Sequence, residues 1–418
     1  MILQLGRICA LLALFADGAS ADPDPASDAF LERLRQTQTD LATVRPITRG
    51  PKSHWFGYYD KFQFDPTERF VLGMEADFDH RSPTRGDVIK IGMIDIEDDD
   101  RWTELGESRA WCWQQGCMLQ WRPGAEDEIL WNDRNGAKLV CHILNVKTNE
   151  KRTVQHAVYH VSPDGRWGLG LDFVRLGEMD RGYGYWGPPD PNRGVLAPDD
   201  STIYLVDLET GQRRELISAA AVARILYSGA TAGDKHYFNH IQWAPNGKRL
   251  LFLNRWNRPG TKWTAGTRMF TLNPAGRDLR LVNVGSSHFE WRNDEQILIW
   301  VNDAYRLFQD DGSAGPGEVV WRAPNGHQSY LPDREWLVTD TYPRGQNHEQ
   351  HVYLHHVPTG RDVLLGAFYV PSGFSGEWRC DTHPRISRSG NKVVIDSTHG
   401  GDGRQMYLID VERVIGQL

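Results

Sequence analysis

The sequence predicts an all-β fold, a closed β-propeller of seven blades. Three observations carry this prediction: the composition, a turn motif that recurs along the chain, and second hairpins that follow several of its copies. The 418 residues include 41 Gly, 16 Trp and 14 Tyr, and long runs of helix-forming residues are scarce. With 40% hydrophobic residues, a chain of this length can bury a large core.

The recurrent motif consists of an aromatic or apolar residue, a turn of Pro, Asp, Asn or Gly, and an apolar strand. The turn residues supply the backbone angles of a hairpin, and the flanks supply strand periodicity. Copies begin at Phe64, Trp121, Val161, Trp243, Trp291, Tyr330 and Ile386. Second hairpins, as in 204–212 and 352–361, raise the expected number of strands per copy to about four, which is the blade of a propeller. The copies are unevenly spaced, which predicts large insertions in some blades.

The N-terminal segment and one insertion lie outside this pattern. Residues 1–21 combine Arg7, a short apolar run and a small-residue cleavage site, which predicts a signal peptide and a periplasmic or secreted protein; a cytosolic N-terminal tail is the alternative. Residues 22–48 are expected to form an N-terminal extension with one short helix, and 49–418 the propeller. The Gly- and Pro-rich segment around 181–191 predicts a long loop over one face, where binding residues are common.

Charge and cysteine content narrow the function further. A net charge of −8 argues against nonspecific binding of nucleic acid, so an anionic ligand would need a local cluster of basic groups. No stretch after the N-terminus is long and apolar enough for a transmembrane helix. Cys112 and Cys117 are expected either to form a disulfide or to be two buried thiols, and both alternatives stay open.

Histidines recur at one position of the motif. Three residues before the aromatic or apolar residue stand, in chain order, Lys61, Met118, Val158, His240, His288, His327 and His383. Because blades are related by rotation about a central channel, equivalent positions converge near its mouth. A single histidine there would ordinarily be structural. Four in consecutive blades predict a shared functional site, most simply a metal site, because imidazole is a common metal ligand.

Cys380 stands three residues before His383. A thiolate and an imidazole at that separation can reach one ion, and His288 and His327 would complete a set of four nitrogen and sulfur ligands. Such a set suits zinc better than manganese. The alternative for Cys380 is a buried thiol that binds nothing.

Several of these segments resemble a known family. They are 53–61, 141–142, 238–240, 287–288 and 380–384, and at these residues the sequence resembles the seven-bladed propeller polysaccharide lyases, namely the oligogalacturonate lyases and the ulvan lyases of similar fold. The resemblance implies β-elimination of an anionic uronic-acid oligosaccharide or polysaccharide. In the oligogalacturonate branch a histidine base matches His240, and histidines that hold a metal match His288 and His383.

The sequence departs from that branch at two positions. Arg385 stands where the branch has a second histidine after His383, and Cys380 stands where it has a glutamine ligand. The ulvan branch uses two histidines in early blades, a tyrosine and an arginine. His142 resembles the first of these histidines, His160 or His156 the second, and Arg255 the arginine.

The chemistry of β-elimination asks for a base, a group that neutralises the uronate carboxylate, and an acid. His240 is the expected base and Arg255 the expected carboxylate clamp. Tyr58, Tyr59 or His142 is the expected acid.

Two other functions compete with the lyase. One is a non-catalytic periplasmic propeller that binds or scaffolds partners. The other is a hydrolase with paired carboxylates, for which the candidates are Glu75, Asp77 and Asp79.

Overall fold

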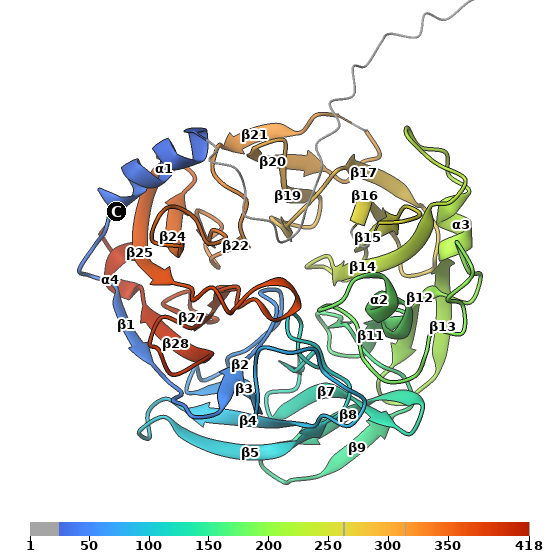
Figure 1. The fold of residues 1–418 in the computed structure, drawn as a ribbon, viewed down its shortest axis with the longest axis horizontal. Helices are drawn as coiled ribbons and strands as arrows, with labels where there is room; N and C mark the ends of the chain where they lie inside the picture. Colours follow the sequence, from blue (N-terminus) through green and yellow to red (C-terminus); the bar gives the residue numbers. More distant parts are fainter. Residues whose placement is uncertain (1–24, 262–263, 314, 418) are drawn as a thin grey trace, which may run out of the picture.

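The computed structural model describes residues 25–261, 264–313 and 315–417. They form seven four-stranded sheets arranged as a ring (Figure 1), and every strand pairing within the sheets is antiparallel. The seven-bladed propeller is thereby confirmed. The expected signal peptide lies outside the described residues, and within them no helix has the length and apolarity to cross a bilayer.

The blades follow one another along the chain, and in each the fourth strand lies at the rim of the ring (Figure 1). Blade 1 consists of β2 (Ser53–Trp55), β3 (Phe70–Ala76), β4 (Ile89–Asp95) and β5 (Arg101–Ser108). Blade 2 consists of β6 (Gln120–Trp121), β7 (Glu128–Asn135), β8 (Lys138–Asn145) and β9 (Lys151–Val154). Blade 3 consists of β10 (His160–Val161), β11 (Trp167–Gly170), β12 (Thr202–Asp207) and β13 (Arg213–Ser218). Blades 4 and 5 consist of β14 (Lys235–Trp243), β15 (Leu250–Asn257), β16 (Thr264–Leu272) and β17 (Arg280–Val284); and β18 (Phe289–Trp291), β19 (Gln296–Val301), β20 (Ala304–Gln309) and β21 (Glu318–Trp321). Blades 6 and 7 consist of β22 (Ser329–Tyr330), β23 (Trp336–Thr339), β24 (Glu349–His356) and β25 (Arg361–Tyr369); and β26 (Arg385–Ile386), β27 (Lys392–Ser397), β28 (Gln405–Asp410) and β1 (Thr43–Pro46).

Each copy of the sequence motif is the hairpin between the first two strands of a blade. Trp243, for example, pairs with Leu250 across this hairpin. In blade 1 the carboxylate of Asp65 accepts hydrogen bonds from the backbone N–H groups of Thr67, Arg69 and Phe70, which closes the turn. The regular turn chemistry of the sequence thus sets the register of the blades.

Blade 7 joins the two ends of the chain. Its rim strand, β1, pairs with β28 from Thr43 opposite Asp410 to Pro46 opposite Tyr407, so blue and red strands lie side by side in Figure 1. The propeller therefore begins at residue 43, ahead of the expected boundary at 49, because closing the ring needs a fourth strand from the N-terminal segment.

Short helices lie outside the strands of the blades. The expected N-terminal helix is α1 (Pro25–Arg35), whose Phe30 packs against Trp321 and Tyr353 at ring-centroid distances of 5.9 and 5.6 Å. Three further short helices are α3 (Ala219–Ala223), η1 (Gly376–Trp378) and α4 (Glu412–Ile415).

The insertion of blade 3 carries helix α2 (Phe173–Met179), which lies beside β14 (Figure 1). The fully buried Arg175 holds it there: its guanidinium donates hydrogen bonds to the backbone carbonyls of His236, Val195 and Leu196. A buried arginine satisfied by backbone carbonyls fixes the long loop against blade 4.

The four described cysteines are free and buried. The sulfur of Cys117 contacts that of Met74 at 3.6 Å, and Cys112 lies 3.6 Å from the carbonyl of Gly116. Of the two alternatives for Cys112 and Cys117, the structure has the buried thiols.

Candidate functional site

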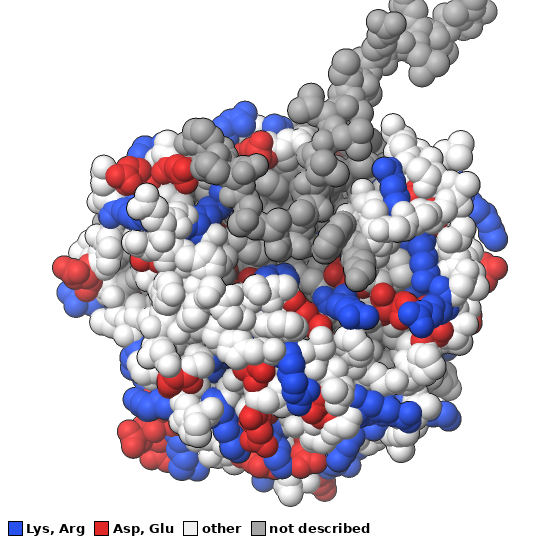
Figure 2. All heavy atoms as spheres, viewed as in Figure 1, with Lys and Arg blue, Asp and Glu red and all other residues white. Residues whose placement is uncertain are grey.

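A cleft of about 730 Å³ opens on the face that carries α2 and η1. Six basic and three acidic side chains line it: Arg181, Arg193, Lys235, Arg255, Arg258, Arg379, Glu178, Asp180 and Glu377. Figure 2 shows basic and acidic side chains next to each other on this face, to the right of its centre. The excess of cations provides the local basic cluster that an anionic ligand of this acidic protein needs.

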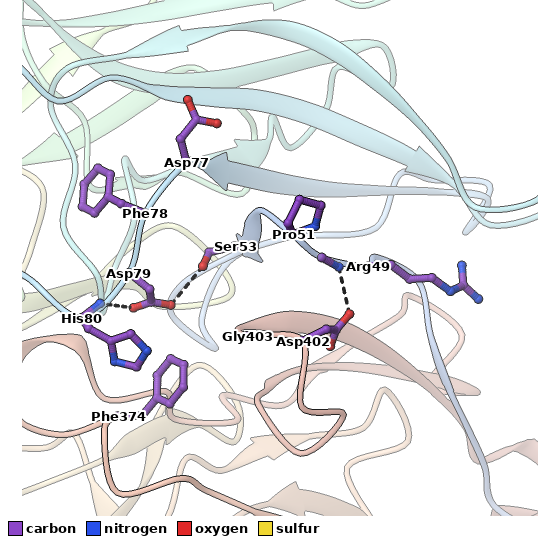
Figure 3. Close-up of a pocket in the computed structure, with 11 residues that line it drawn as sticks. Arg49, Pro51, Ser53, Asp77, Phe78, Asp79, His80, Phe374, Asp402 and Gly403 are labelled. Atoms are coloured by element: carbon purple, nitrogen blue, oxygen red, sulfur yellow. Dashed lines mark hydrogen bonds between the residues drawn. The ribbon is translucent and has the colours of Figure 1, made fainter.

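A second cavity of about 530 Å³ lies at the edge between blades 1 and 7, lined by Asp77 and Asp79 (Figure 3). Glu75 binds Lys52 at 2.6 Å and lies 3.2 Å from Nε2 of His54. Asp79 accepts a hydrogen bond from Ser53. All three carboxylates considered for a hydrolase thus have partners within the protein, since the exposed Asp77 also lies 3.5 Å from Nζ of Lys52.

The four motif histidines gather below the cleft, around Tyr58. Its ring stacks on His240 at 4.7 Å and meets His383 edge-on at 5.0 Å. The rings of His288 and His327 lie 4.2 Å apart, as do those of His327 and His383. All five side chains are buried, with at most 7% of each residue exposed. The structure therefore brings together the four histidines that the sequence aligned.

Both ring nitrogens of His240 contact neighbouring side chains. The Asn239 oxygen accepts the backbone N–H of His240 at 2.8 Å, and the Asn239 amide nitrogen lies 3.2 Å from Nε2. The amide nitrogen of Gln115 and the hydroxyl of Tyr159 each lie 3.1 Å from Nδ1. Burial lowers the pKa of His240 well below its usual value, and Arg255 lowers it further. His240 is therefore a neutral imidazole, the form of histidine that can accept a proton.

The backbone at two of these histidines is strained. His240 and His383 have φ angles of 53° and 41°, in the left-handed region, and β14 has a register shift at His240. Such a conformation in a residue other than glycine costs on the order of 1–3 kcal/mol and is concentrated at functional sites.

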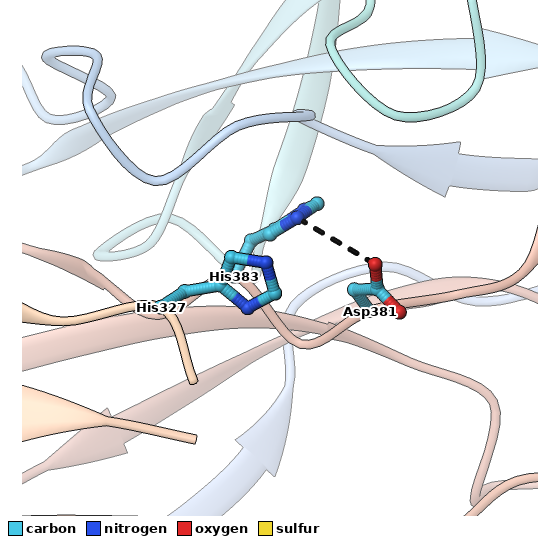
Figure 4. Close-up of side chains that lie close together, drawn as sticks. All are labelled: His327, Asp381 and His383. Carbon is cyan, nitrogen blue, oxygen red and sulfur yellow. Dashed lines mark ion pairs between the residues drawn. The ribbon is translucent and has the colours of Figure 1, made fainter. Parts of the chain in front are cut away.

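His327, His383 and Asp381 form a group whose ligand atoms lie within 4.8 Å of one another (Figure 4). Nε2 of His383 is 3.9 Å from Oδ2 of Asp381. Nε2 of His327, Nε2 of His383 and Oδ1 of Asp381 are all buried and have no hydrogen-bond partner among the described residues. Because unsatisfied buried polar atoms are costly, the two Nε2 atoms together with the Asp381 carboxylate fit a bound divalent cation.

Hydrogen bonds also orient the ring of His327, a member of this group, and the ring of its neighbour His288. Nδ1 of His327 donates to Asp340, and Nδ1 of His288 donates to Asn325 at 2.9 Å, so both rings carry their lone pair on Nε2. Burial, followed by the neighbouring His327, lowers the pKa of His288 and of His383 well below the usual value. Neutral imidazoles are the form that binds a metal.

Cys380 is not in this group. It packs in an apolar cluster with Val370 and Phe374, and burial raises the pKa of its thiol to about 12. A protonated thiol is not a metal ligand. Asp381, two residues before His383, lies beside it instead.

Of the other expected catalytic residues, Arg255, Tyr58 and Tyr59 lie beside His240 or the neighbouring histidines, and His142 lies elsewhere. Arg255 lines the cleft and binds Asp180 at 3.3 Å. His142 binds Thr153 and Asp133 within blade 2. Tyr59 donates to the carbonyl of Phe289 at 2.8 Å, bridging blade 1 to blade 5.

The two remaining histidines of early blades also stand apart. His160 neighbours Asp60 and Lys61, and burial lowers its pKa to about 4. His156 lies against Tyr204 at 6.1 Å.

Three residues of the site escaped the sequence analysis: Asp381, Tyr183 and Arg379. Tyr183 comes from the insertion, lines the cleft, and meets the ring of His240 edge-on at 5.6 Å. Arg379 lines the cleft and binds both Asp381 and Tyr183. The i, i+2 spacing to His383 was a signal for Asp381, whereas the other two lie outside the motif.

Comparisons with known proteins agree with the fold. No protein-family model matches the chain, and no curated protein matches its sequence. Among solved structures, it is similar to an oligogalacturonate lyase in complex with manganese, with a TM-score of 0.62 and 14% identity over 88% of this chain and 93% of the other. An oligogalacturonate lyase from Vibrio parahaemolyticus is similar to the same extent, with a TM-score of 0.62, 13% identity, and 88% and 93% coverage. At this identity the likeness is one of fold.

Proposed function

We propose that this chain is a lyase that cleaves an acidic, uronate-containing oligosaccharide or polysaccharide by β-elimination. One observation carries the proposal: a buried neutral imidazole, His240, lies beside Tyr183 and Arg255 of an arginine-lined cleft and near a group of two histidines and an aspartate that could hold a cation. The similarity in fold to oligogalacturonate lyases supports it.

The cleft would bind the substrate through its carboxylates. Arg255 lines the cleft and lies close enough to His240 to lower its pKa. A guanidinium can hold a carboxylate through two parallel hydrogen bonds, which fixes the sugar ring as well as attracting it. Asp180, 3.3 Å from Arg255, orients this guanidinium.

His240 would act as the base. It accepts the proton from C5 of the uronate, the C4–O bond to the leaving sugar breaks, and a C4–C5 double bond forms. The electron pair leaves with the glycosidic oxygen, which takes a proton from an acid. Tyr183 lines the cleft beside His240 and is better placed for this than Tyr59, whose hydroxyl is bound to Phe289.

His327, Asp381 and His383 would hold a divalent cation, with His288 beside them. Such a cation, when bound, supplies positive charge that neutralises the uronate carboxylate and so favours loss of the C5 proton. The expected preference for zinc rested on a Cys380 thiolate, and a set of imidazoles and one carboxylate gives no such preference over manganese.

The test is an assay on a panel of uronic-acid polymers and oligomers, with neutral polysaccharides as the control, that follows the ultraviolet absorbance of the conjugated product. The proposal expects absorbance to rise with at least one uronate and with no neutral polymer. Binding of a uronate polymer without any unsaturated product would favour a non-catalytic binding protein. An extracellular polymer would also suit the expected export of the chain, which sequencing the N-terminus of the mature protein would test.

A further inference from the structure

Arg379 lies between the cation site, formed by His327, Asp381 and His383, and the arginine-lined cleft. Its Nε donates to Oδ2 of Asp381 at 2.8 Å, and one of its terminal nitrogens donates to the hydroxyl of Tyr183 at 2.7 Å. The side chain is only 15% exposed, and that of Asp381 is 1% exposed. The guanidinium of Arg379 thus binds both Asp381, a candidate cation ligand, and Tyr183, whose ring faces His240.

The contact with Asp381 fixes the orientation of its carboxylate. Arg379 binds Oδ2, the oxygen that lies 3.9 Å from Nε2 of His383, and Oδ1 has no hydrogen-bond partner in the described part of the chain. A charge-assisted hydrogen bond to one oxygen restricts the rotation of the whole carboxylate and so holds it beside His383.

The contact with Tyr183 orders the wall of the cleft. Tyr183 belongs to the insertion of blade 3, and its ring packs edge-on against His240. The backbone carbonyl of Arg379 accepts hydrogen bonds from Gln114 at 3.0 Å and from Arg404 at 3.2 Å, so the arginine itself is anchored. Because Arg379 is anchored, its side chain fixes the position of Tyr183 relative to that of Asp381.

We propose that Arg379 is a positioning residue that couples the cation site to the cleft wall beside the base. It holds Asp381 for the cation and Tyr183 against His240, so that occupation of the cation site orders the segment 180–187. The inference rests on the cation site of the proposed function, and it does not depend on the lyase chemistry.

The test uses Mn²⁺ alone as the probe, with the full chain. Calorimetry gives the Mn²⁺ affinity, and hydrogen exchange reports the backbone amides of Tyr183 and Tyr185, which donate to Asp180 and Phe173. In the wild type, Mn²⁺ is expected to slow exchange of these amides. Arg379→Gln is expected to weaken Mn²⁺ binding about 10- to 100-fold, the usual effect of losing a group that orients a metal ligand, and to abolish the protection at saturating Mn²⁺.

Three further variants separate positioning from a general structural role. Tyr183→Phe is expected to keep wild-type Mn²⁺ affinity but to lose the protection, because only one of the two contacts is removed. Arg379→Lys, which cannot make both contacts, is expected to recover part of the affinity and none of the protection. Arg388→Gln, at an exposed arginine of blade 7 that stacks on Phe62 away from the cleft, is the matched control and is expected to behave as the wild type.

Wild-type affinity in Arg379→Gln, or full protection by Mn²⁺ in that variant, would overturn the inference. So would a wild-type chain that binds no Mn²⁺. If Arg379→Gln does not fold, the protection measured in Tyr183→Phe decides the coupling. The uronate assay is independent of all these outcomes: a coupled cation site in a chain without lyase activity would refute the proposed function and leave the coupling standing.

Discussion

The carboxylate of Asp340 accepts the Nδ1–H of His327, with its two oxygens 2.9 and 3.0 Å from that nitrogen. It also accepts the backbone N–H of His327 and the hydroxyl of Thr382. This places the proton of His327 on Nδ1 and its lone pair on the buried Nε2. Carboxylates in this relation to a histidine are typical of metal sites, where they orient the ring and raise its basicity.

Asp340→Asn should therefore weaken divalent-cation binding about 10- to 100-fold. The substituted amide can turn its NH₂ toward Nδ1, which moves the ring proton to Nε2 and removes the lone pair. Calorimetric titration with Zn²⁺ and with Mn²⁺ measures the effect. Asp362→Asn is the matched control because Asp362 binds His355 at 2.7 Å, outside the cluster. Equal affinities in Asp340→Asn and wild type would exclude Nε2 of His327 as a ligand.

A second prediction decides between the two neighbours Cys380 and Asp381. Cys380→Ala should keep the cation affinity, since the thiol lies in an apolar cluster and its pKa is raised to about 12. Asp381→Asn should lose most of the affinity, because a neutral amide replaces a charged ligand. The two dissociation constants are compared by the same titration. The reverse result would restore the expected thiolate ligand and with it the preference for zinc.

His240→Ala should reduce the rate of β-elimination by on the order of 100- to 10,000-fold, the usual effect of removing a positioned base. His142→Ala is the control: this histidine is bound to Thr153 and Asp133 within blade 2 and should be dispensable. Initial rates on the best uronate substrate, with circular dichroism as a check of folding, measure both. Full activity in His240→Ala together with loss in His142→Ala would place the base in the earlier blade.

The pH dependence of stability should carry the signature of a buried histidine, His351. Burial lowers its pKa from the ordinary 6.5 to about 4, and both ring nitrogens lack a hydrogen-bond partner within the described residues. Between these values the unfolded chain takes up a proton that the folded protein excludes. Stability is therefore full above pH 6.5 and is lost as the pH falls toward 4, by up to about 3 kcal/mol from this residue.

His351→Phe should remove that part of the loss. Urea unfolding followed by tryptophan fluorescence, at neutral and at acidic pH, gives the free energy of unfolding of both proteins. We expect a smaller difference between the two pH values in the variant than in the wild type. An unchanged difference would show that His351 takes up its proton in the folded protein as readily as in the unfolded chain.

The sequence alone determined the repeat and the alignment of its histidines. The turn residues around Asp65, Asp164 and Asp333 act locally, through hydrogen bonds to backbone within a few residues, so their pattern predicts hairpins without any knowledge of the fold. Once seven hairpins were counted, rotation about one axis was enough to bring His240, His288, His327 and His383 together.

Only the tertiary structure decided which side chains join these histidines. Asp381 replaces Cys380 because the direction of a side chain depends on the local path of the backbone. Tyr183 reaches His240 from an insertion, and β1 crosses to β28 to close the ring. Such contacts join segments far apart in the chain, and their selection depends on packing and burial, which a pattern of turns and strands does not contain.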